Sequence, residues 1–199
     1  MAPPTDAPAG SRKLILLAGA SGSGKSRLAR LAGCPQVSLD DFYRDGDDAD
    51  LPHTLGIVDW DDIGSWDVAG AVAALTKLSR EGVADVPVYS IMKNRRTGVR
   101  TVRLEAATTF VAEGVFAPDV VPLCRAAGLS VEALYLDRPR IVTLVLRFAR
   151  DLRERLKPPW VLVRRGLALW RAEPRIRRHA VACGCRPVGL HTALAAVRS

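Results

Sequence analysis

A stretch near the N-terminus has the residue types and spacing that bind phosphate. Residues 19–26 read GASGSGKS and fit the pattern G-x-x-x-x-G-K-[ST]. Glycines let the backbone curl so that successive N–H groups point at phosphate oxygens, while the lysine reaches the β- and γ-phosphates and the serine hydroxyl ligates Mg²⁺. We therefore predict a site for ATP or GTP with Mg²⁺. Its predicted nucleotide-binding residues are Gly19, Ser21, Gly22, Ser23, Gly24, Lys25 and Ser26.

Two acidic residues further along the chain are candidates for proton and metal chemistry. Asp40 follows a short predicted strand, at the edge where α/β sheets bind ligands. A carboxylate there can accept the proton of an attacking hydroxyl or hold a water of Mg²⁺, unless it only caps a helix. Asp41 is the alternative, because adjacent residues face different ways. Glu113 lies in an apolar run and needs a partner, either Mg²⁺ or an ion pair. The predicted metal ligands are Ser26, Asp40 and Glu113.

Alternating strands and helices must position these residues. The continuous apolar run at 13–18 predicts a central parallel strand buried on both faces. Further strands are predicted at 36–39, 85–89, 100–104, 109–115, 133–136 and 180–185. Helices are predicted at 25–32, from a Ser65 cap to Gly82, at 119–127, from an Asp137 cap to 157, at 160–171 and at 190–197. Residues 40–64 read as irregular or partly helical. This alternation predicts an α/β fold with a mainly parallel sheet flanked by helices.

Missing motifs narrow the class of phosphate-binding protein. The sequence has no N-K-x-D motif for reading guanine and no hydrophobic strand ending in Asp-Glu, as motor ATPases have. A small-molecule kinase needs an acid near the acceptor hydroxyl, basic residues over the phosphates and an acceptor pocket. The sequence offers candidates for all three, which favours a small-molecule kinase.

Six short motifs, in order along the chain, resemble the uridine kinase family of P-loop nucleoside kinases. They are GASGSGKS at 19–26, LDDFY at 39–43, DWDD and SWD between 59 and 67, PVYS and two arginines between 87 and 96, VAEGVF at 111–116, and RD with ER between 150 and 155. The family's pattern near residue 63 includes a proline that this chain lacks. The motifs span nearly the whole globular part of the sequence.

The resemblance implies a P-loop fold with a five-stranded sheet, a small substrate-binding hairpin and a helical lid at about 147–160. It implies that Asp40 faces the acceptor hydroxyl, and that Arg150 and Arg155 of the lid bind the phosphates, with Arg150 and Lys25 in catalytic roles. The implied acceptor-site residues are Tyr43, Asp61, Tyr89, Asn94 and Arg96. Where the family commonly has a histidine that reads the pyrimidine, this chain has Asn94 in the same stretch, which can also donate and accept hydrogen bonds.

The favoured activity is ATP-dependent transfer of the γ-phosphate to the 5′-hydroxyl of uridine or cytidine. Pantothenate- and phosphoribulose-type kinases of related fold remain alternatives, as does an ATP-binding regulatory protein without kinase activity. Alternatively, the arginines at the lid position lie on a solvated face of a helix, and the tyrosines only pack against neighbouring side chains.

Composition and charge are those of a globular protein. The 199 residues are 48% hydrophobic and 25% charged, with a net charge of +8. We expect residues 1–10 to form a disordered tail and residues 11–199 a single domain.

Charge is unevenly distributed along the chain. Residues 40–67 are acidic and residues 138–178 basic, as expected for facing walls of a metal and phosphate site or for two solvated faces. The basic part lacks the interleaved aromatics of a stacking platform, so no nucleic-acid partner is expected. A homo-oligomer is possible.

Cysteines and apolar runs bear on the compartment. The four cysteines and three histidines show no zinc-site spacing, and we expect free buried thiols in a reducing compartment. The apolar run at 14–18 is too short for a signal peptide or a membrane span and leads into the phosphate motif. We therefore expect a cytoplasmic protein that does not bind membranes.

Overall fold

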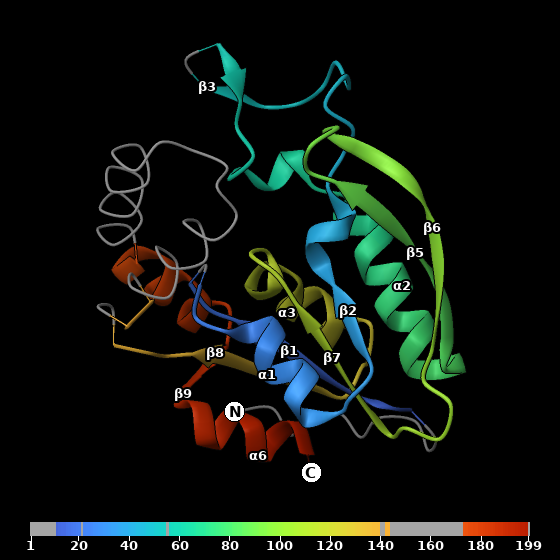
Figure 1. The fold of residues 1–199 in the computed structure, drawn as a ribbon, viewed down its shortest axis with the longest axis vertical. Helices are drawn as coiled ribbons and strands as arrows, with labels where there is room; N and C mark the ends of the chain where they lie inside the picture. Colours follow the sequence, from blue (N-terminus) through green and yellow to red (C-terminus); the bar gives the residue numbers. More distant parts are fainter. Residues whose placement is uncertain (1–10, 21, 55, 140–141, 144–172, 199) are drawn as a thin grey trace.

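A five-stranded parallel sheet forms the centre of the computed structural model (Figure 1). The structure describes residues 11–20, 22–54, 56–139, 142–143 and 173–198. The strands lie side by side in the order β2, β7, β1, β8, β9, and every neighbouring pair is parallel. Their bounds are β1 Lys13–Ala18, β2 Gln36–Ser38, β7 Thr109–Glu113, β8 Val131–Leu136 and β9 Arg186–Val188. The predicted α/β class with a mainly parallel sheet is confirmed.

The apolar sequence of β1 explains its central place. Leu14 and Leu16 point into one hydrophobic core, whereas Ile15 and Leu17 point into the other, and all four are fully buried. A strand that alternates between two cores has no polar face, so its sequence is a continuous apolar run. The carboxyl end of this strand leads directly into the phosphate motif.

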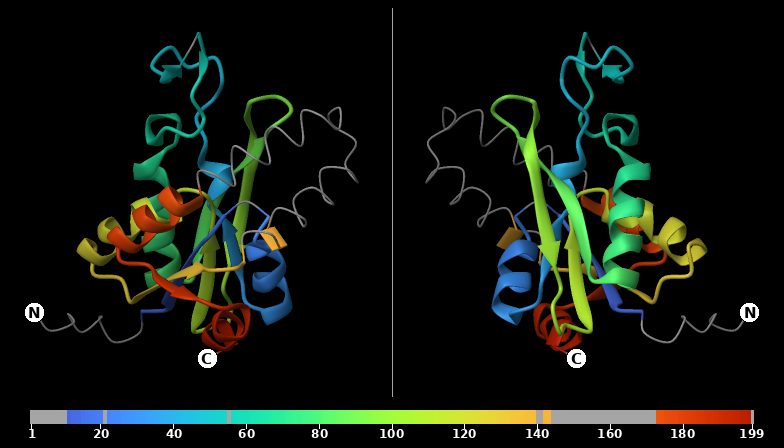
Figure 2. Two further views of the ribbon diagram at one scale, coloured as in Figure 1. Left: turned by 90° about the vertical axis from the view of Figure 1, so that its left-hand side faces the viewer. Right: turned by 90° about the vertical axis from the view of Figure 1, so that its right-hand side faces the viewer.

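Helices cover both faces of the sheet, as Figure 2 shows. Helices α1 (Lys25–Ala32) and α6 (Leu190–Arg198) pack on one face. On the other face lie α2 (Val68–Glu81), α3 (Ala117–Ala126) and a helix formed by residues 173–182. This arrangement leaves the carboxyl ends of the strands as the place where loops from both layers meet.

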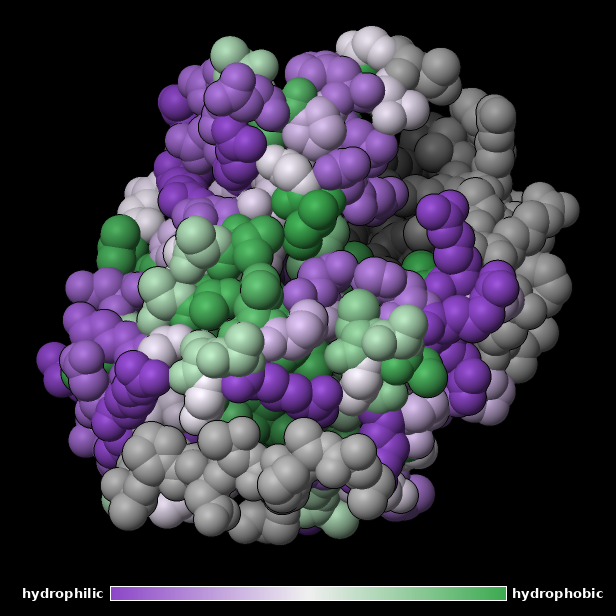
Figure 3. Space-filling model, turned by 180° about the vertical axis from the view of Figure 1, so that it is seen from behind, coloured by the Kyte–Doolittle hydropathy of each residue, from purple (hydrophilic) through white to green (hydrophobic). Residues whose placement is uncertain are grey.

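An antiparallel hairpin stands apart from the central sheet. Strands β5 (Val83–Ser90) and β6 (Arg95–Arg103) form their own two-stranded sheet. The predicted strands at 85–89 and 100–104 are parts of this longer hairpin. The irregular segment before it holds two 3-10 helices, η1 (Leu39–Phe42) and η2 (Ile63–Ser65), and two short paired strands, β3 (His53–Thr54) and β4 (Ile57–Val58). The end of the molecule with β3 and β4 is mainly hydrophilic (Figure 3).

Two local expectations are wrong. Asp67, not Ser65, caps α2, because its side chain accepts the N–H of Gly70 at 2.8 Å. Residues 180–185 do not form a strand. The helix of residues 173–182 runs through the first half of that stretch and buries Ala180, and Gly184 ends it with a left-handed φ of 91°. The last strand begins only at Arg186.

Several predicted segments lie outside the described residues. These are the tail at 1–10, most of the helix after Asp137, the lid at about 147–160 and the helix at 160–171. Among the described residues, no helix has the length and apolar character that crossing a membrane requires.

Candidate active site

The phosphate motif joins β1 to α1 at the carboxyl edge of the sheet. Gly24 takes a left-handed φ of 93° as the N-cap of α1 and, as a glycine, offers no side chain to cap the N–H groups of the first turn. Those N–H groups and the positive end of the helix form an anion site. The Lys25 Nζ donates to the carbonyls of Gly19 at 2.8 Å and Ala20 at 3.3 Å, so the ammonium lies over the loop. Ser21 lies outside the described residues.

Strand register brings Glu113 to the same edge. Glu113 is the last residue of β7 and pairs with Leu17 of β1, two residues before the loop begins. The Ser26 hydroxyl donates to Glu113 Oε1 at 2.7 Å. Burial raises the pKa of the Glu113 carboxyl, and the hydrogen bond from Ser26 and the Lys25 charge oppose that rise. An ion pair was the alternative partner predicted for Glu113. Among the described residues Glu113 forms no ion pair, and its hydrogen-bond partner is the Ser26 hydroxyl.

Asp40 comes to this edge from the neighbouring strand. It lies in η1 directly after β2, and β2 pairs with β7 so that Ser38 lies beside Glu113. The Asp40 Oδ1 accepts the backbone N–H of Val115 at 3.2 Å. Asp40 is exposed at the mouth of the site, but the protein atoms around its carboxyl still remove enough water to raise its pKa. The Lys25 charge acts in the opposite direction.

Gly114 lets these two acidic segments approach each other. A Cβ atom on Gly114 would lie 2.7 Å from the Leu39 Cβ and 2.9 Å from Asp40 Oδ1. Both distances are too short for real contacts, so any larger residue would push η1 away. The glycine therefore sets how closely Asp40 approaches the end of β7.

The adjacent acid, Asp41, has other partners. Its Oδ1 accepts the backbone N–H of Tyr89 at 3.3 Å, and its Oδ2 lies 3.6 Å from an Arg100 amino group. Asp41 therefore ties η1 to the hairpin, while Asp40 faces the end of β7. The geometry favours Asp40 over Asp41 for chemistry at the phosphates.

The oxygen atoms gathered here suit a magnesium ion. Ser26 contributes a hydroxyl, and Glu113 and Asp40 contribute carboxylates, which are the hard donors that Mg²⁺ prefers. Ser26 and Glu113 line a cavity of about 410 Å³. Its other lining residues are Arg30, Gln36, Ser38 and Arg100. An ion that keeps several waters has room beside the serine and the glutamate.

A larger cavity, of about 540 Å³, lies where β8 and β9 end. It is lined by Asp137, Arg138, Pro139, Pro187, Val188 and Gly189. The phosphate loop lies next to it, since a Cβ on Gly19 would be 3.2 Å from the Leu136 carbonyl oxygen. Sequence reasoning missed these residues because it predicted the end of β8 but placed the last strand at 180–185, so the second strand end of this crevice was not recognised.

On the other side of Asp40, aromatic rings gather. The Tyr43 ring lies 5.7 Å from the rings of Trp60 and Tyr89 and 5.9 Å from that of Phe116, between centroids. The Tyr43 hydroxyl donates to the Trp60 carbonyl at 3.2 Å. Burial, followed by the nearby Asp40 and Asp61 charges, raises the pKa of Tyr43. Tyr43 therefore has a packing role, with its hydroxyl already bonded.

Tyr89 differs from Tyr43. Its hydroxyl is buried and has no hydrogen-bond partner among the described residues. Burial also raises the pKa of this phenol. Burying a hydroxyl without a hydrogen-bond partner destabilises the fold, and a bound molecule with a polar group could supply that partner. Tyr89 is thus a better candidate than Tyr43 for a polar contact with an acceptor.

The remaining predicted acceptor residues lie at different places. Arg96 donates to the Tyr43 carbonyl at 3.2 Å and to Asp67 Oδ2 at 3.0 Å, so it joins η1 to the start of α2. Asn94 lies in the exposed turn of the hairpin with a φ of 47°. Asp61 is exposed before η2. Arg150 and Arg155 lie outside the described residues.

Known proteins with similar sequences are uridine kinases. One from Tolumonas auensis is 30% identical over 154 residues, which cover 71% of this chain and 69% of that protein. One from Haemophilus influenzae is 26% identical over 153 residues, covering 71% and 70%. No protein-family model matches the chain.

A solved structure shows the same fold. A protein described as a candidate fructose transport system kinase from Silicibacter sp. TM1040 aligns with a TM-score of 0.58 and 18% identity, covering 92% of this chain and 91% of that one. The five-stranded parallel sheet flanked by helices is the arrangement that the two share.

Proposed function

This chain belongs to the uridine kinase family of P-loop kinases, and from that premise we propose that it transfers the γ-phosphate of ATP or GTP to the 5′-hydroxyl of a pyrimidine nucleoside, with Mg²⁺. One observation carries the proposal. The carboxylates of Asp40 and Glu113 and the hydroxyl of Ser26 meet beside the phosphate loop, with an aromatic cluster next to Asp40. A phosphate site, a metal site and a site for a flat acceptor are thus contiguous.

The phosphates of the donor would lie on the loop and the first turn of α1. The N–H groups there would bind phosphate oxygens, and Lys25 would turn from the carbonyls of Gly19 and Ala20 toward the β- and γ-phosphates. The bound Mg²⁺ would bridge phosphate oxygens and neutralise charge. Ser26 and Glu113 would hold that ion, directly or through water.

Asp40 would manage the proton of the acceptor. Its carboxylate orients the acceptor hydroxyl for in-line attack and accepts its proton as the new oxygen–phosphorus bond forms and the bond to the β-phosphate oxygen breaks. Desolvation raises the pKa of this carboxyl, which makes it a stronger base than an ordinary aspartate. Water-mediated contact with Mg²⁺ is the second role open to the same oxygen atoms.

The two cavities and the aromatic cluster suggest where the rest of each substrate lies. The 540 Å³ cavity beside Gly19 has the size and place for the base of the donor. The acceptor would lie against the aromatic cluster, with the Tyr89 hydroxyl as a polar contact and Asp61 and Asn94 at the rim. Tyr43 and Arg96 would act as positioning residues. Arg150 and Arg155, in a lid at about 147–160 of a single domain, would close over the phosphates.

A panel assay tests this function. ADP release is measured with Mg²⁺ and ATP or GTP against uridine, cytidine, purine nucleosides, pantothenate, ribulose 5-phosphate and fructose, with Lys25→Ala and Asp40→Asn as controls. Turnover with uridine or cytidine that both variants abolish supports the proposal. Turnover with another acceptor keeps the kinase and replaces the acceptor. Tight ATP binding without turnover on any acceptor would instead favour a regulatory ATP-binding protein.

A further inference from the structure

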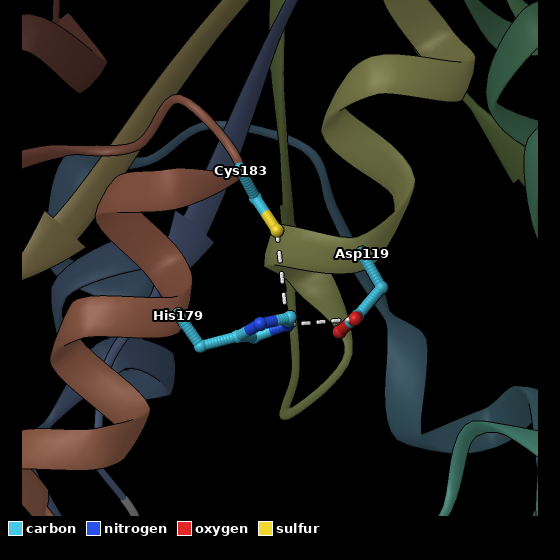
Figure 4. A group of neighbouring side chains, drawn as sticks. All are labelled: Asp119, His179 and Cys183. Carbon is cyan, nitrogen blue, oxygen red and sulfur yellow. Dashed lines mark hydrogen bonds and ion pairs between the residues drawn. The ribbon is translucent and has the colours of Figure 1, made fainter.

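Three potential metal ligands meet on the side of the molecule that α3 covers. Asp119 lies in the first turn of α3, and His179 and Cys183 lie at the end of the helix of residues 173–182 and in the turn after it (Figure 4). One oxygen, one nitrogen and one sulfur atom of these residues all lie within 4.8 Å of one another. His179 is exposed, and the other two are half-buried.

The histidine presents the same atom to both neighbours. His179 Nε2 lies 2.8 Å from Asp119 Oδ1 and 3.7 Å from Cys183 Sγ. In a proton relay, the acid bonds one ring nitrogen and the nucleophile faces the other. Here both groups face one nitrogen, so the three donors point at a common place instead of forming a chain (Figure 4). This convergence is typical of metal ligands.

We propose that Asp119 Oδ1, His179 Nε2 and Cys183 Sγ bind a divalent transition metal ion, with Zn²⁺ as the ion that fits best. Zn²⁺ takes Cys, His and carboxylate ligands in tetrahedral sites at bond lengths of about 2.0–2.3 Å. Such bonds separate the ligand atoms by about 3.3–3.8 Å, which the histidine–cysteine pair already meets, while the aspartate oxygen has to move back from the histidine nitrogen by about 1 Å or less. A thiolate excludes Mg²⁺, which prefers oxygen. The exposure of His179 leaves the fourth position open to water.

The surrounding charges suit a cation. The last carbonyl groups of the helix of residues 173–182 give its end a partial negative charge, which favours a cation there. A carboxylate and a thiolate balance the two positive charges of the ion. The neighbouring cation, Arg125, is held by the Gly184 carbonyl, to which its amino group donates at 3.4 Å.

A bound ion would link two elements that flank the active site. Helix α3 begins three residues after Gly114, and the helix of residues 173–182 carries Arg177, which pairs with Asp137 of the 540 Å³ cavity at 2.9 Å. The ion would hold that helix against α3. This site is separate from the proposed phosphoryl-transfer chemistry and does not depend on it.

Zinc binding to the whole chain tests the proposal. Zn²⁺ is titrated by calorimetry in millimolar Mg²⁺, so that the oxygen site around Glu113 is occupied by magnesium, with Co²⁺ as a spectroscopic substitute. We expect one Zn²⁺ per chain and a thiolate-to-cobalt charge-transfer band. Zn²⁺ at 100 times its Kd should raise the ratio of folded to unfolded protein by about 100-fold.

Matched variants identify the ligands. Cys183→Ser and His179→Ala should each weaken Zn²⁺ binding at least 10-fold and remove or shift the cobalt band. Cys34→Ser and His191→Ala change a thiol and an imidazole elsewhere in the chain and should leave both unchanged. Unchanged Zn²⁺ affinity in Cys183→Ser, or wild-type cobalt spectra without a charge-transfer band, would overturn the proposal even if a variant failed to fold.

Discussion

On the phosphate side of the site, the side chains come from segments at the ends of three neighbouring parallel strands. Ser26 donates a hydrogen bond to Glu113, and Asp40 accepts one from the backbone of Val115, two residues after Glu113. On the acceptor side, the polar atoms come from loops and from a hairpin outside the central sheet. Two of the predicted residues there, Tyr43 and Arg96, already have hydrogen bonds to the chain itself. The phosphate side is thus built by the sheet, and the acceptor side by packing onto it.

Under the proposed function, this difference separates residues expected to do chemistry from residues expected to hold others in place. Among the described residues, one hydrogen bond, from the Val115 N–H, reaches the Asp40 carboxylate, and desolvation raises its pKa, as expected for a group that reacts. Arg96 bonds several groups from two elements, as expected for a group that positions. The predictions below measure this separation, from the largest expected effect to the smallest.

Asp40→Asn should lower kcat roughly 10²–10⁴-fold, because the amide cannot accept the acceptor's proton. The KM for the acceptor should change little, since the side chain keeps its shape. Steady-state kinetics with saturating Mg-ATP measure both values. The matched control is Asp41→Asn, which removes the ion pair to Arg100 and should keep most of kcat. Equal loss in the two variants would contradict the assignment of Asp40.

Gly114→Ala should lower kcat at least 10-fold with the fold intact. The added methyl would lie 2.7 Å from Leu39 Cβ and would push η1 and Asp40 away from β7. Overpacking of this kind costs about 1–3 kcal/mol of stability. The measurements are kcat and the urea midpoint, with Gly98→Ala as the control, because a Cβ there meets no atom within 4 Å and neither Gly98 nor Gly114 has a left-handed φ. If both variants kept full activity, the close approach would have no functional role.

Tyr89→Phe should change acceptor binding, whereas Tyr43→Phe should change stability. Tyr89→Phe removes the unbonded hydroxyl, so it should raise the acceptor KM about 3–10-fold and leave stability nearly unchanged. Tyr43→Phe removes the hydroxyl that bonds Trp60, so it should cost about 1 kcal/mol of stability. Acceptor kinetics and urea unfolding distinguish the two. A stability loss confined to Tyr89→Phe would reverse the roles given to these tyrosines.

The smallest effect concerns stability and pH. The raised pKa of Asp40 means that its ionised form destabilises the folded state, because the folded protein holds the proton more tightly than the unfolded chain. Asp40→Asn should therefore be slightly more stable than the wild type at neutral pH without Mg²⁺. This advantage should shrink as pH falls and the wild-type carboxyl becomes protonated. Urea midpoints from pH 5 to 8 test it, and a less stable Asp40→Asn at pH 7 would contradict it.

The phosphate side could be predicted from the sequence because its signals are local. The apolar run at 13–18 predicts a buried central strand, and the glycine spacing after it predicts a phosphate loop. Asp40 and Glu113 lie at or near the carboxyl ends of two other predicted strands, and such ends meet at one edge of a parallel sheet. The strand predicted at 180–185 is wrong because its short apolar run also fits a helix, and only the packing of Ala180 against the core decides between them.

Non-local contacts explain what the sequence could not predict. The roles of Tyr89 and Arg96 depend on which loop lies beside each residue, and the spacing of residues carries no information about that. The same holds for Asp119 and His179, which are 60 residues apart in the chain and 2.8 Å apart in space. Metal-site spacing rules describe ligands that are close in sequence and therefore do not detect this cluster.

Phosphorus NMR of the products tests the central claim most directly. The wild-type chain is incubated with Mg-ATP and uridine, with Asp40→Asn in parallel. The account predicts equal amounts of ADP and of a phosphate monoester whose phosphorus couples to the two protons of the uridine 5′-carbon, with neither product formed at a comparable rate by the variant. ADP and inorganic phosphate without any phosphate monoester, with uridine and with cytidine, would contradict transfer to a pyrimidine nucleoside.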